Sequence, residues 1–248
     1  PNDLRFFELI ADQLSITASL VRTYQDLLDL EKKRINLGRY FSPGLAEHLV
    51  ADDRMTGLGG QSKMVSVVFA DITGFTSLVE INAVEDVVEV LNRFFETVVP
   101  VIFEHGGMLD KFLGDGVMAV FGIPDTDELD PVKAIQCSVD IQKGMQDLKE
   151  RLKADGLFPI DVGIGIASGI VLAGNIGTKN QMNYTVIGEP VNLAQRLESI
   201  SKPGEIVIAN LTKDMIPQGV DLGVEFESMG TIQVKGFSRD VSPLRIVY

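Results

Sequence analysis

The chain has 248 residues, 45% of them hydrophobic, and a formal net charge of −13 at pH 7, which fits one large domain or a medium domain with an appendage. So acidic a chain is not expected to bind nucleic acid generally, because phosphate recognition requires clustered Lys and Arg. The single cysteine, Cys137, excludes an internal disulfide framework and favours a reducing compartment such as the cytoplasm, and two histidines make a histidine-rich zinc site implausible. No apolar run is long enough to span a membrane, and no signal peptide is recognisable, so we expect no membrane association of this chain.

The first segment, residues 1–43, is predicted to be a long helix that ends in a turn. Between its first residue and Gly38 it contains neither Gly nor Pro. Apolar residues recur every seven positions: Phe7, Leu14, Val21, Leu28 and Ile35. A second column, three positions later, is weakened by Thr17 and Glu31. The pattern fits either a helix packed on its own domain or a parallel dimeric coiled coil, and the residues leave both open. Gly38 and the FSPG of 41–44 are expected to end the helix.

A polar, glycine-bearing linker (44–63) is expected before the main domain (64–248), in which strand and helix patterns alternate. Strands are predicted in 64–71, twice within 108–122, and in 161–177, 206–209 and 244–248; helices are predicted in 84–104, 131–155 and 190–201. Gly114-Asp115-Gly116 is a hairpin signal between the strands of 108–122. This order predicts an α+β domain with a ferredoxin-like, palm-like βααββαβ core, extra C-terminal strands and an N-terminal helix. The glycines of 163–169 lack the G-x-G-x-x-G spacing of a dinucleotide fold.

Two aspartates follow or join predicted strands. Asp71 comes directly after the apolar run 67–70, and Asp115 stands between two glycines at the hairpin tip. Acids at neighbouring strand ends can bind Mg²⁺, which completes its shell with water and substrate phosphates. The alternative is that Asp71 caps the next turn and Asp115 is an ordinary hairpin residue, and composition alone favours this alternative.

Three ordered motifs carry a family resemblance: FADITGFT at 69–76, KFLGDGVMAVFG at 111–122 and YTVIGEPVNLAQRLE at 184–198. Together they resemble the catalytic domains of class III nucleotidyl cyclases, over about residues 60–248. These enzymes convert ATP or GTP to the 3′,5′-cyclic monophosphate and pyrophosphate. The resemblance implies that Asp71, Ile72 and Asp115 bind two divalent ions, Mg²⁺ or Mn²⁺.

The resemblance also implies roles in binding phosphate and ribose. Phosphates would be cradled by the backbone of Ile72, Thr73, Gly74 and Phe75. Asn192 and Arg196, which share one face of a helix, would orient the ribose and stabilise charge on the pentavalent phosphorus; the planar, permanently charged guanidinium suits that task. Lys235, in VKG at 234–236, matches the family's lysine that reaches the triphosphate.

Lys111 and Thr185 are expected to read the base. Lysine can donate to adenine N1, and a threonine hydroxyl can accept from the N6 amine. Guanylate-selective members of the family typically carry Glu at the position of Lys111, so this lysine indicates ATP. The Lys/Thr pair, in place of the Asp that many adenylate cyclases carry at 185, is similar to a subgroup of bicarbonate-responsive cyanobacterial and mammalian soluble enzymes, which implies a bicarbonate response. Ile170 stands where some members carry a phosphate-binding Arg.

A homodimer is predicted from the reach of one hairpin. Lys111 and Asp115 are separated by up to about 13 Å along an extended strand, so one nucleotide is not expected to meet both from the same chain. A two-fold dimer would place the metal aspartates of one subunit against the base and ribose residues of the other, as the resemblance also implies. The N-terminal helix and segment 34–43 are similar to the end of a sensor such as a GAF domain followed by a cyclase-transducing segment, and a chain that opens on Pro1 without Met is expected to lack its upstream sensor.

Three other functions were weighed. A guanylate cyclase is disfavoured by Lys111. A diguanylate cyclase would carry GGDEF, where this chain has LGDG at 113–116. A catalytically inactive nucleotide-binding module would be expected to have lost a metal aspartate, Asn192 or Arg196, and all of these are present.

Overall fold

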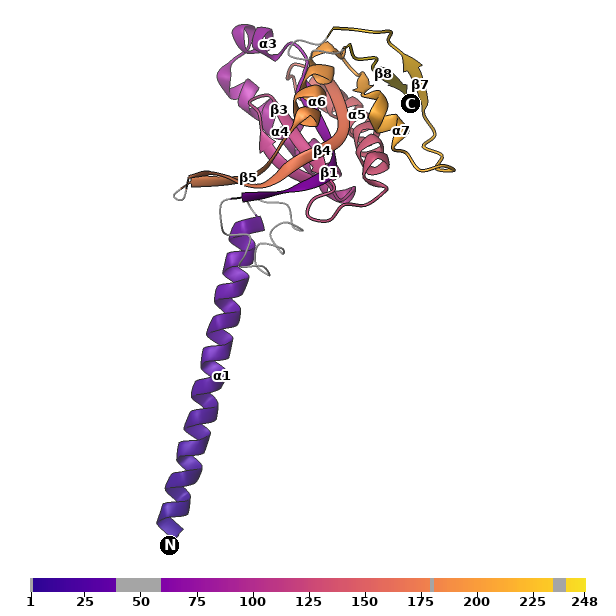
Figure 1. Cartoon of the computed structure of the whole chain (residues 1–248). Coiled ribbons are helices and arrows are strands. Elements are labelled where there is room, and N and C mark those ends of the chain that lie inside the picture. Colours follow the sequence, from indigo (N-terminus) through magenta and orange to yellow (C-terminus); the bar gives the residue numbers. More distant parts are fainter. Residues whose placement is uncertain (1, 39–58, 179–180, 234–239) are drawn as a thin grey trace. The chain divides into compact units, whose positions relative to one another are not determined.

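The N-terminal part of the chain is one long helix, α1 (Asn2–Gly38), drawn in indigo in Figure 1. The computed structural model describes residues 2–38, 59–178, 181–233 and 240–248, and divides into two units, Pro1–Asp53 and Arg54–Tyr248. Every side chain of α1 from 13 to 32 is exposed. These include large apolar residues around the helix: Leu14, Ile16, Leu20, Val21, Tyr24, Leu27, Leu28 and Leu30. The predicted turn at 41–44 and the linker up to residue 58 lie outside the described residues. Within the described ranges no helix is both long and apolar enough to cross a membrane.

The second unit is built on a mixed sheet with the order β2-β3-β1-β4-β6-β8-β7, and β5 pairs with β4. The strands are β1 (Gly59–Ile72), β2 (Met108–Phe112), β3 (Gly116–Phe121), β4 (Val162–Thr178), β5 (Gln181–Ile187), β6 (Ile206–Ile208), β7 (Glu225–Ser228) and β8 (Leu244–Val247). The helices are α3 (Phe75–Ile81), α4 (Val84–Glu104), α5 (Asp130–Ala154), α6 (Glu189–Ile200) and α7 (Asn210–Asp214). The succession β1-α3-α4-β2-β3-α5-β4 confirms the predicted βααββαβ core.

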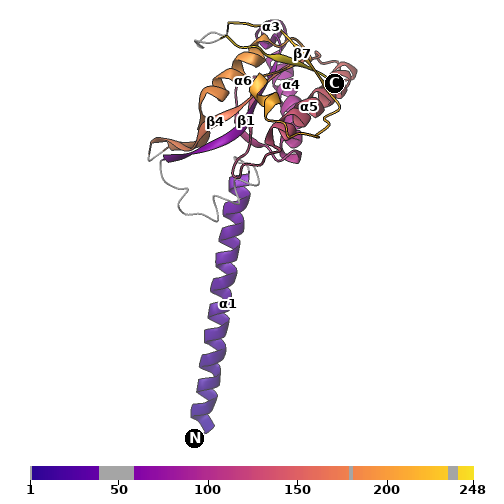
Figure 2. The ribbon, with the colours of Figure 1, turned by 45° about the vertical axis from the view of Figure 1, so that its right-hand side comes forward.

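Several elements differ from the sequence prediction. Strand β1 begins at Gly59 rather than 64, and the region where strands were predicted (161–177) forms a single strand of 17 residues, β4 (Val162–Thr178). Glycines are weak strand formers, but β1 and β4 pair without a break over 14 residues, and that pairing overrides their propensity. The predicted core has two helices after its first strand, but only the second was located (84–104). Helix α3 and strand β5 were not located in the sequence, because short elements give little periodicity. In Figures 1 and 2, β4 curves along its length. Its C-terminal end and the N-terminal end of β1 extend together away from the helices.

The two faces of β1 meet different helices. Val68, Ala70 and Ile72 belong to the buried core that contains Phe94 of α4 and Ile135 of α5. Side chains alternate along a strand, so the odd-numbered residues, which end at Asp71, lie on the other face. Helix α6 packs against β4 and β1, and we place it on this second face because its own buried residues are absent from that core.

The predicted hairpin between β2 and β3 is confirmed. The Leu113 amide donates to the Gly116 carbonyl at 2.8 Å, leaving Gly114 and Asp115 as the two-residue loop. Gly114 has φ +73°, the left-handed conformation that such tight turns require and that glycine adopts without strain. The conformation of the turn therefore determines the position of Asp115 at the tip of the hairpin.

Candidate active site

Asp71 and Asp115 lie together at the end of the β1–β3 pair, as predicted. Asp71 pairs with Gly116 across the strands, and the Ile72 amide donates to the Asp115 carbonyl at 3.2 Å and to Asp71 Oδ1 at 3.1 Å. A Cβ on Gly116 would stand 2.6 Å from Asp71 Oδ1, so only glycine leaves room for the carboxylate. Gly116 is thus required by packing against Asp71 as well as by its place next to the turn.

The electrostatics of this pair favour a bound cation. Burial first, and then the charge of Asp115, raise the pKa of Asp71 to about 6. Two half-buried carboxylates that repel each other are relieved by a divalent ion, and oxygen donors suit Mg²⁺. No group of three or more His, Cys, Asp or Glu residues is arranged around a common ion in the described part of the chain. Backbone carbonyls, water and phosphate oxygens would therefore complete the shell, as is usual for Mg²⁺. The residues present fit such ions.

Glu198 is a third acid at this site, and the sequence analysis missed it. Burial, and then the charges of Asp71 and Asp115, raise its pKa to about 7. Two glycines bring it there: a Cβ on Gly165 would stand 2.2 Å from the Glu198 amide, and one on Gly163, the partner of Asp71, would stand 2.1 Å from Ser201 Oγ. An acidic residue in the last turn of a helix interacts unfavourably with the helix dipole. This unfavourable position is the sequence signal from which Glu198 could have been identified.

Two of the four backbone amides of 72–75, the segment predicted to cradle phosphates, are occupied in the structure. The Thr73 amide donates to the Asp161 carbonyl at 2.9 Å, and the Ile72 amide is also occupied. Gly74 has φ +72° and its carbonyl accepts the amides of Ser77 and Leu78, which starts α3. In the segments that the structure describes, the amides of Gly74 and Phe75 donate to no backbone carbonyl. Those two amides remain for a phosphate.

Lys111 and Thr185 meet although 74 residues separate them. Lys111 Nζ donates to Thr185 Oγ1 at 2.9 Å, Thr185 donates to Asp110 Oδ2 at 2.9 Å, and Lys111 Nζ lies 2.8 Å from the same Asp110 oxygen. Strand β5 brings Thr185 to β2. The predicted pair is therefore part of a triad, whose third member, Asp110, the sequence analysis overlooked beside the lysine.

Asn192 and Arg196 are exposed and lie one turn apart on α6. At about 100° per residue, they point roughly 150° away from the buried stripe of the same helix. That stripe consists of Pro190, Ala194 and Leu197. Helix α6 thus turns Glu198 toward the aspartates of its own chain and turns Asn192 and Arg196 away from the sheet. Ile170 is 63% exposed, and Lys235 lies outside the described residues.

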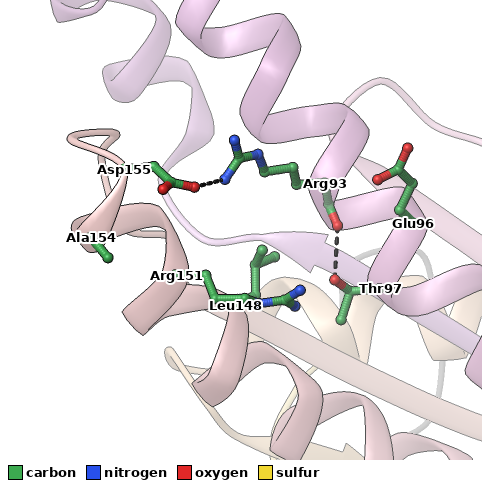
Figure 3. A pocket seen from close by; sticks show the side chains of 7 residues that line it. All are labelled: Arg93, Glu96, Thr97, Leu148, Arg151, Ala154 and Asp155. Carbon is green, nitrogen blue, oxygen red and sulfur yellow. Dashed lines mark hydrogen bonds and ion pairs between the residues drawn. The ribbon is translucent and has the colours of Figure 1, made fainter.

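Two surface cavities lie away from these groups. One of about 660 Å³ lies between α4 and α5, where Arg93 forms ion pairs with Glu89 at 2.8 Å and with Asp155, as Figure 3 shows for the latter. The other cavity, of about 340 Å³, is lined by residues that include His105 and Asp140, and His105 Nε2 lies 3.1 Å from Asp140 Oδ2. Neither contains a predicted site residue.

Comparisons place these features among known proteins. The family described as "Adenylate and Guanylate cyclase catalytic domain" matches residues 60–244. An uncharacterized protein of Mycobacterium tuberculosis is 37% identical over 183 residues, or 73% of this chain and 32% of that protein. The adenylyl cyclase CyaB from P. aeruginosa is 38% identical with a TM-score of 0.72, over 77% of this chain and 97% of that one. The guanylyl cyclase Cya2 is 35% identical with a TM-score of 0.69, over 76% and 94%. The chain spans about a third of the length of the curated relatives it matches.

The acidic site predicts an unusual dependence of stability on pH. The folded-state pKa values of Asp71 and Glu198 are raised from 3.8 to about 6 and from 4.5 to about 7. The folded protein therefore binds more protons than the unfolded chain between these values, and this stability, complete below about pH 4, is lost as pH rises through 6 to 7. Without divalent ions, Glu198→Gln should raise the melting temperature at pH 8 by about 2–4 °C, as for roughly 1 kcal/mol in a domain of this size.

The matched control is Glu189→Gln, at the first turn of the same helix, where a negative charge is favourable. It should leave the melting temperature unchanged or lower it. Calorimetry at pH 5 and pH 8 in EDTA measures both variants. Equal pH dependence of the melting temperature in wild type and Glu198→Gln would show that neither burial nor the aspartates raise the pKa of Glu198 in the folded protein.

Proposed function

Because this chain belongs to the family of adenylate and guanylate cyclase catalytic domains, the class III nucleotidyl cyclases, we propose that it converts ATP to 3′,5′-cyclic AMP and pyrophosphate. The observation that carries the choice of ATP is the Lys111–Thr185 contact of 2.9 Å. Thr185 gives its only proton to Asp110, so its oxygen is an acceptor for the N6 amine of adenine, while Lys111 donates to N1. Guanine presents a donor at N1 and an acceptor at O6, the opposite arrangement.

In the reaction, the ribose 3′-hydroxyl loses its proton to solvent and its oxygen forms a bond to the α-phosphorus, while the bond from that phosphorus to the bridging oxygen of the pyrophosphate breaks. Asp71, Asp115 and the Ile72 carbonyl would hold two divalent ions, Mg²⁺ or Mn²⁺. Bound there, such ions would supply Lewis-acid activation of the 3′-hydroxyl and neutralise charge on the leaving pyrophosphate. The amides of Gly74 and Phe75 donate to phosphate oxygens.

Two copies of the chain complete the site. Asn192 and Arg196 point away from the sheet that carries their own Asp71, so they serve the aspartates of a partner chain. There Asn192 orients the ribose, and Arg196 donates to the oxygens of the pentavalent phosphorus, where charge develops in the transition state. Lys235 reaches the triphosphate. The α1 helices pair through the exposed stripe of Leu14, Val21 and Leu28, transmitting the state of an upstream sensor domain, and bicarbonate stimulates the reaction.

Guanylate cyclase activity is the second candidate, favoured by the 35% identity to Cya2. Product analysis after incubation with Mg²⁺ and either ATP or GTP separates the two. We expect cyclic AMP from wild type. Lys111→Glu should lower kcat/KM for ATP by about 10²-fold or more, because the donor to N1 becomes an acceptor that faces an acceptor. An unchanged ratio of ATP to GTP in kcat/KM would move base recognition away from Lys111.

The metal aspartates are tested by removal. Asp71→Ala and Asp115→Ala should each lower kcat by roughly 10³-fold, since Lewis-acid stabilisation is worth several kcal/mol and each 1.36 kcal/mol is tenfold. Their folding should persist, because neither side chain packs in the core, and circular dichroism checks this. Activity near wild type with Mg²⁺ in either variant contradicts the assignment.

Subunit complementation tests the shared site. Asp71→Ala and Asn192→Ala should each be inactive alone. In a heterodimer, both lesions fall in one site and the other site is intact. Equal random mixing makes half of the dimers heterodimers, so activity should recover to about one quarter of wild type per total protein. Verified subunit exchange without recovery would show that each chain builds its site alone.

A further inference from the structure

We propose that Asp110 is a positioning residue that makes the base site selective for a 6-amino purine, by fixing the hydrogen-bond polarity of Thr185 and Lys111. This inference rests on the proposed cyclisation of ATP. It deepens that proposal because a lysine and a threonine alone do not distinguish the purines. Lysine can donate to guanine O6 as well as to adenine N1, and a free hydroxyl can turn either to donate or to accept.

The contacts of Asp110 remove that freedom. Its Oδ2 atom receives the Thr185 hydroxyl at 2.9 Å and the Lys111 ammonium at 2.8 Å. An ionised carboxylate only accepts, so the single proton of Thr185 is committed to it. The Thr185 oxygen, which already accepts from Lys111 at 2.9 Å, has acceptor capacity alone to offer a base. Two of the three N–H donors of the Lys111 ammonium are used by Thr185 and Asp110, and the third is available for an acceptor such as adenine N1.

The second oxygen of the Asp110 carboxylate is buried at a cost to stability. The Asp110 side chain has no exposed surface, whereas that of Lys111 is 41% exposed. The second oxygen, Oδ1, is buried and has no hydrogen-bond partner within the described residues. A buried carboxylate oxygen without a partner costs stability. A residue kept at such a cost, one position before the base-reading lysine, has its explanation in the site.

A β-bulge makes the triad geometrically feasible. The register of β2 with β3 shifts between Leu109 and Lys111, so that Asp110 is the extra residue. In a regular strand, neighbouring side chains point to opposite faces, and Asp110 would turn away when Lys111 faces Thr185. A bulge re-aims one side chain. Here it allows two consecutive residues to reach the same hydroxyl.

The decisive variant is Asp110→Asn, which keeps the size of the side chain but can turn its amide to donate to Thr185. The hydroxyl is then free to donate to guanine O6. We expect the ratio of kcat/KM for ATP to that for GTP to fall by at least tenfold. A merely structural role would lower both values together and leave the ratio unchanged.

A double-mutant cycle locates the effect at the hydroxyl. Thr185→Val should lower the ATP to GTP ratio by itself, and Asp110→Asn in that background should change it no further, because the group that Asp110 orients is gone. The control is Asp130→Asn: Asp130 is also buried and lies 3.5 Å from a lysine, Lys133, but belongs to another part of the fold. Its ratio should equal that of wild type.

The outcomes separate this inference from the proposed function. Wild type that prefers ATP, with Asp110→Asn holding the same ratio within about twofold, overturns the role of Asp110 and leaves the adenylate cyclase proposal intact. Wild type without a preference for ATP overturns the proposed function and the inference with it. If Asp110→Asn does not fold, Thr185→Val tests the same polarity, and an unchanged ratio in that variant overturns the inference.

Discussion

The pairing of β1 with β4 over 14 residues is the constraint on which the rest of this domain depends. At one end it sets Asp71 opposite Gly163, under the last turn of α6; toward the other it carries Gly174, the partner of Thr185. These two points are 11 residues apart on β4, or roughly 36 Å along the strand. One hydrogen-bonded ladder therefore helps to determine where both Asp71 and Thr185 lie.

The close approach of acidic residues at this site lowers the stability of the fold. Three carboxylates, Asp71, Asp115 and Glu198, approach one another at the strand ends, and Glu198 does so from the unfavourable end of a helix. The contact of Asp110 with Lys111 and Thr185 adds a buried carboxylate, one oxygen of which has no partner among the described residues. In a chain with a net charge of −13, such local concentrations of negative charge are relieved by cations rather than by the fold. Ion binding and stability are thus expected to be coupled in this protein.

The orientation of α6 gives a physical reason for control by assembly. Its buried stripe fixes the helix on the sheet, and the same rotation that brings Glu198 to the aspartates turns Asn192 and Arg196 outward. Within the described part of one chain, no contact joins the Lys111–Thr185 pair to the Asp71–Asp115 pair. If the two half-sites face each other across a dimer, small changes in how the subunits are set alter the alignment of the reacting groups. A long helix ahead of the domain is well suited to impose such changes.

The sequence by itself determined the features that depend on local rules. Helix 84–104 was predicted from its 3.6-residue periodicity, the hairpin at Gly114-Asp115 from its turn chemistry, and the βααββαβ order from the alternation of patterns. The family motifs identified Asp71, Asp115, Lys111 and Thr185, because these positions are marked by neighbours in the chain. The structure confirms the predicted fold. It also places Asp71 near Asp115 and Lys111 in contact with Thr185.

Only the tertiary structure decided where the side chains of Asp110 and Glu198 lie and which backbone amides of 72–75 are occupied. Asp110 faces Thr185 because of a bulge and a strand from 75 residues away, and no local pattern encodes either. Glu198 lies near enough for the charge of Asp71 to raise its pKa, because two glycines let α6 lie close on β4, a matter of packing between distant segments. The Thr73 amide is occupied by the carbonyl of Asp161, which the chain brings from another strand end. Side-chain polarity, burial and free donors arise from such long-range contacts, and a sequence read along its length does not contain them.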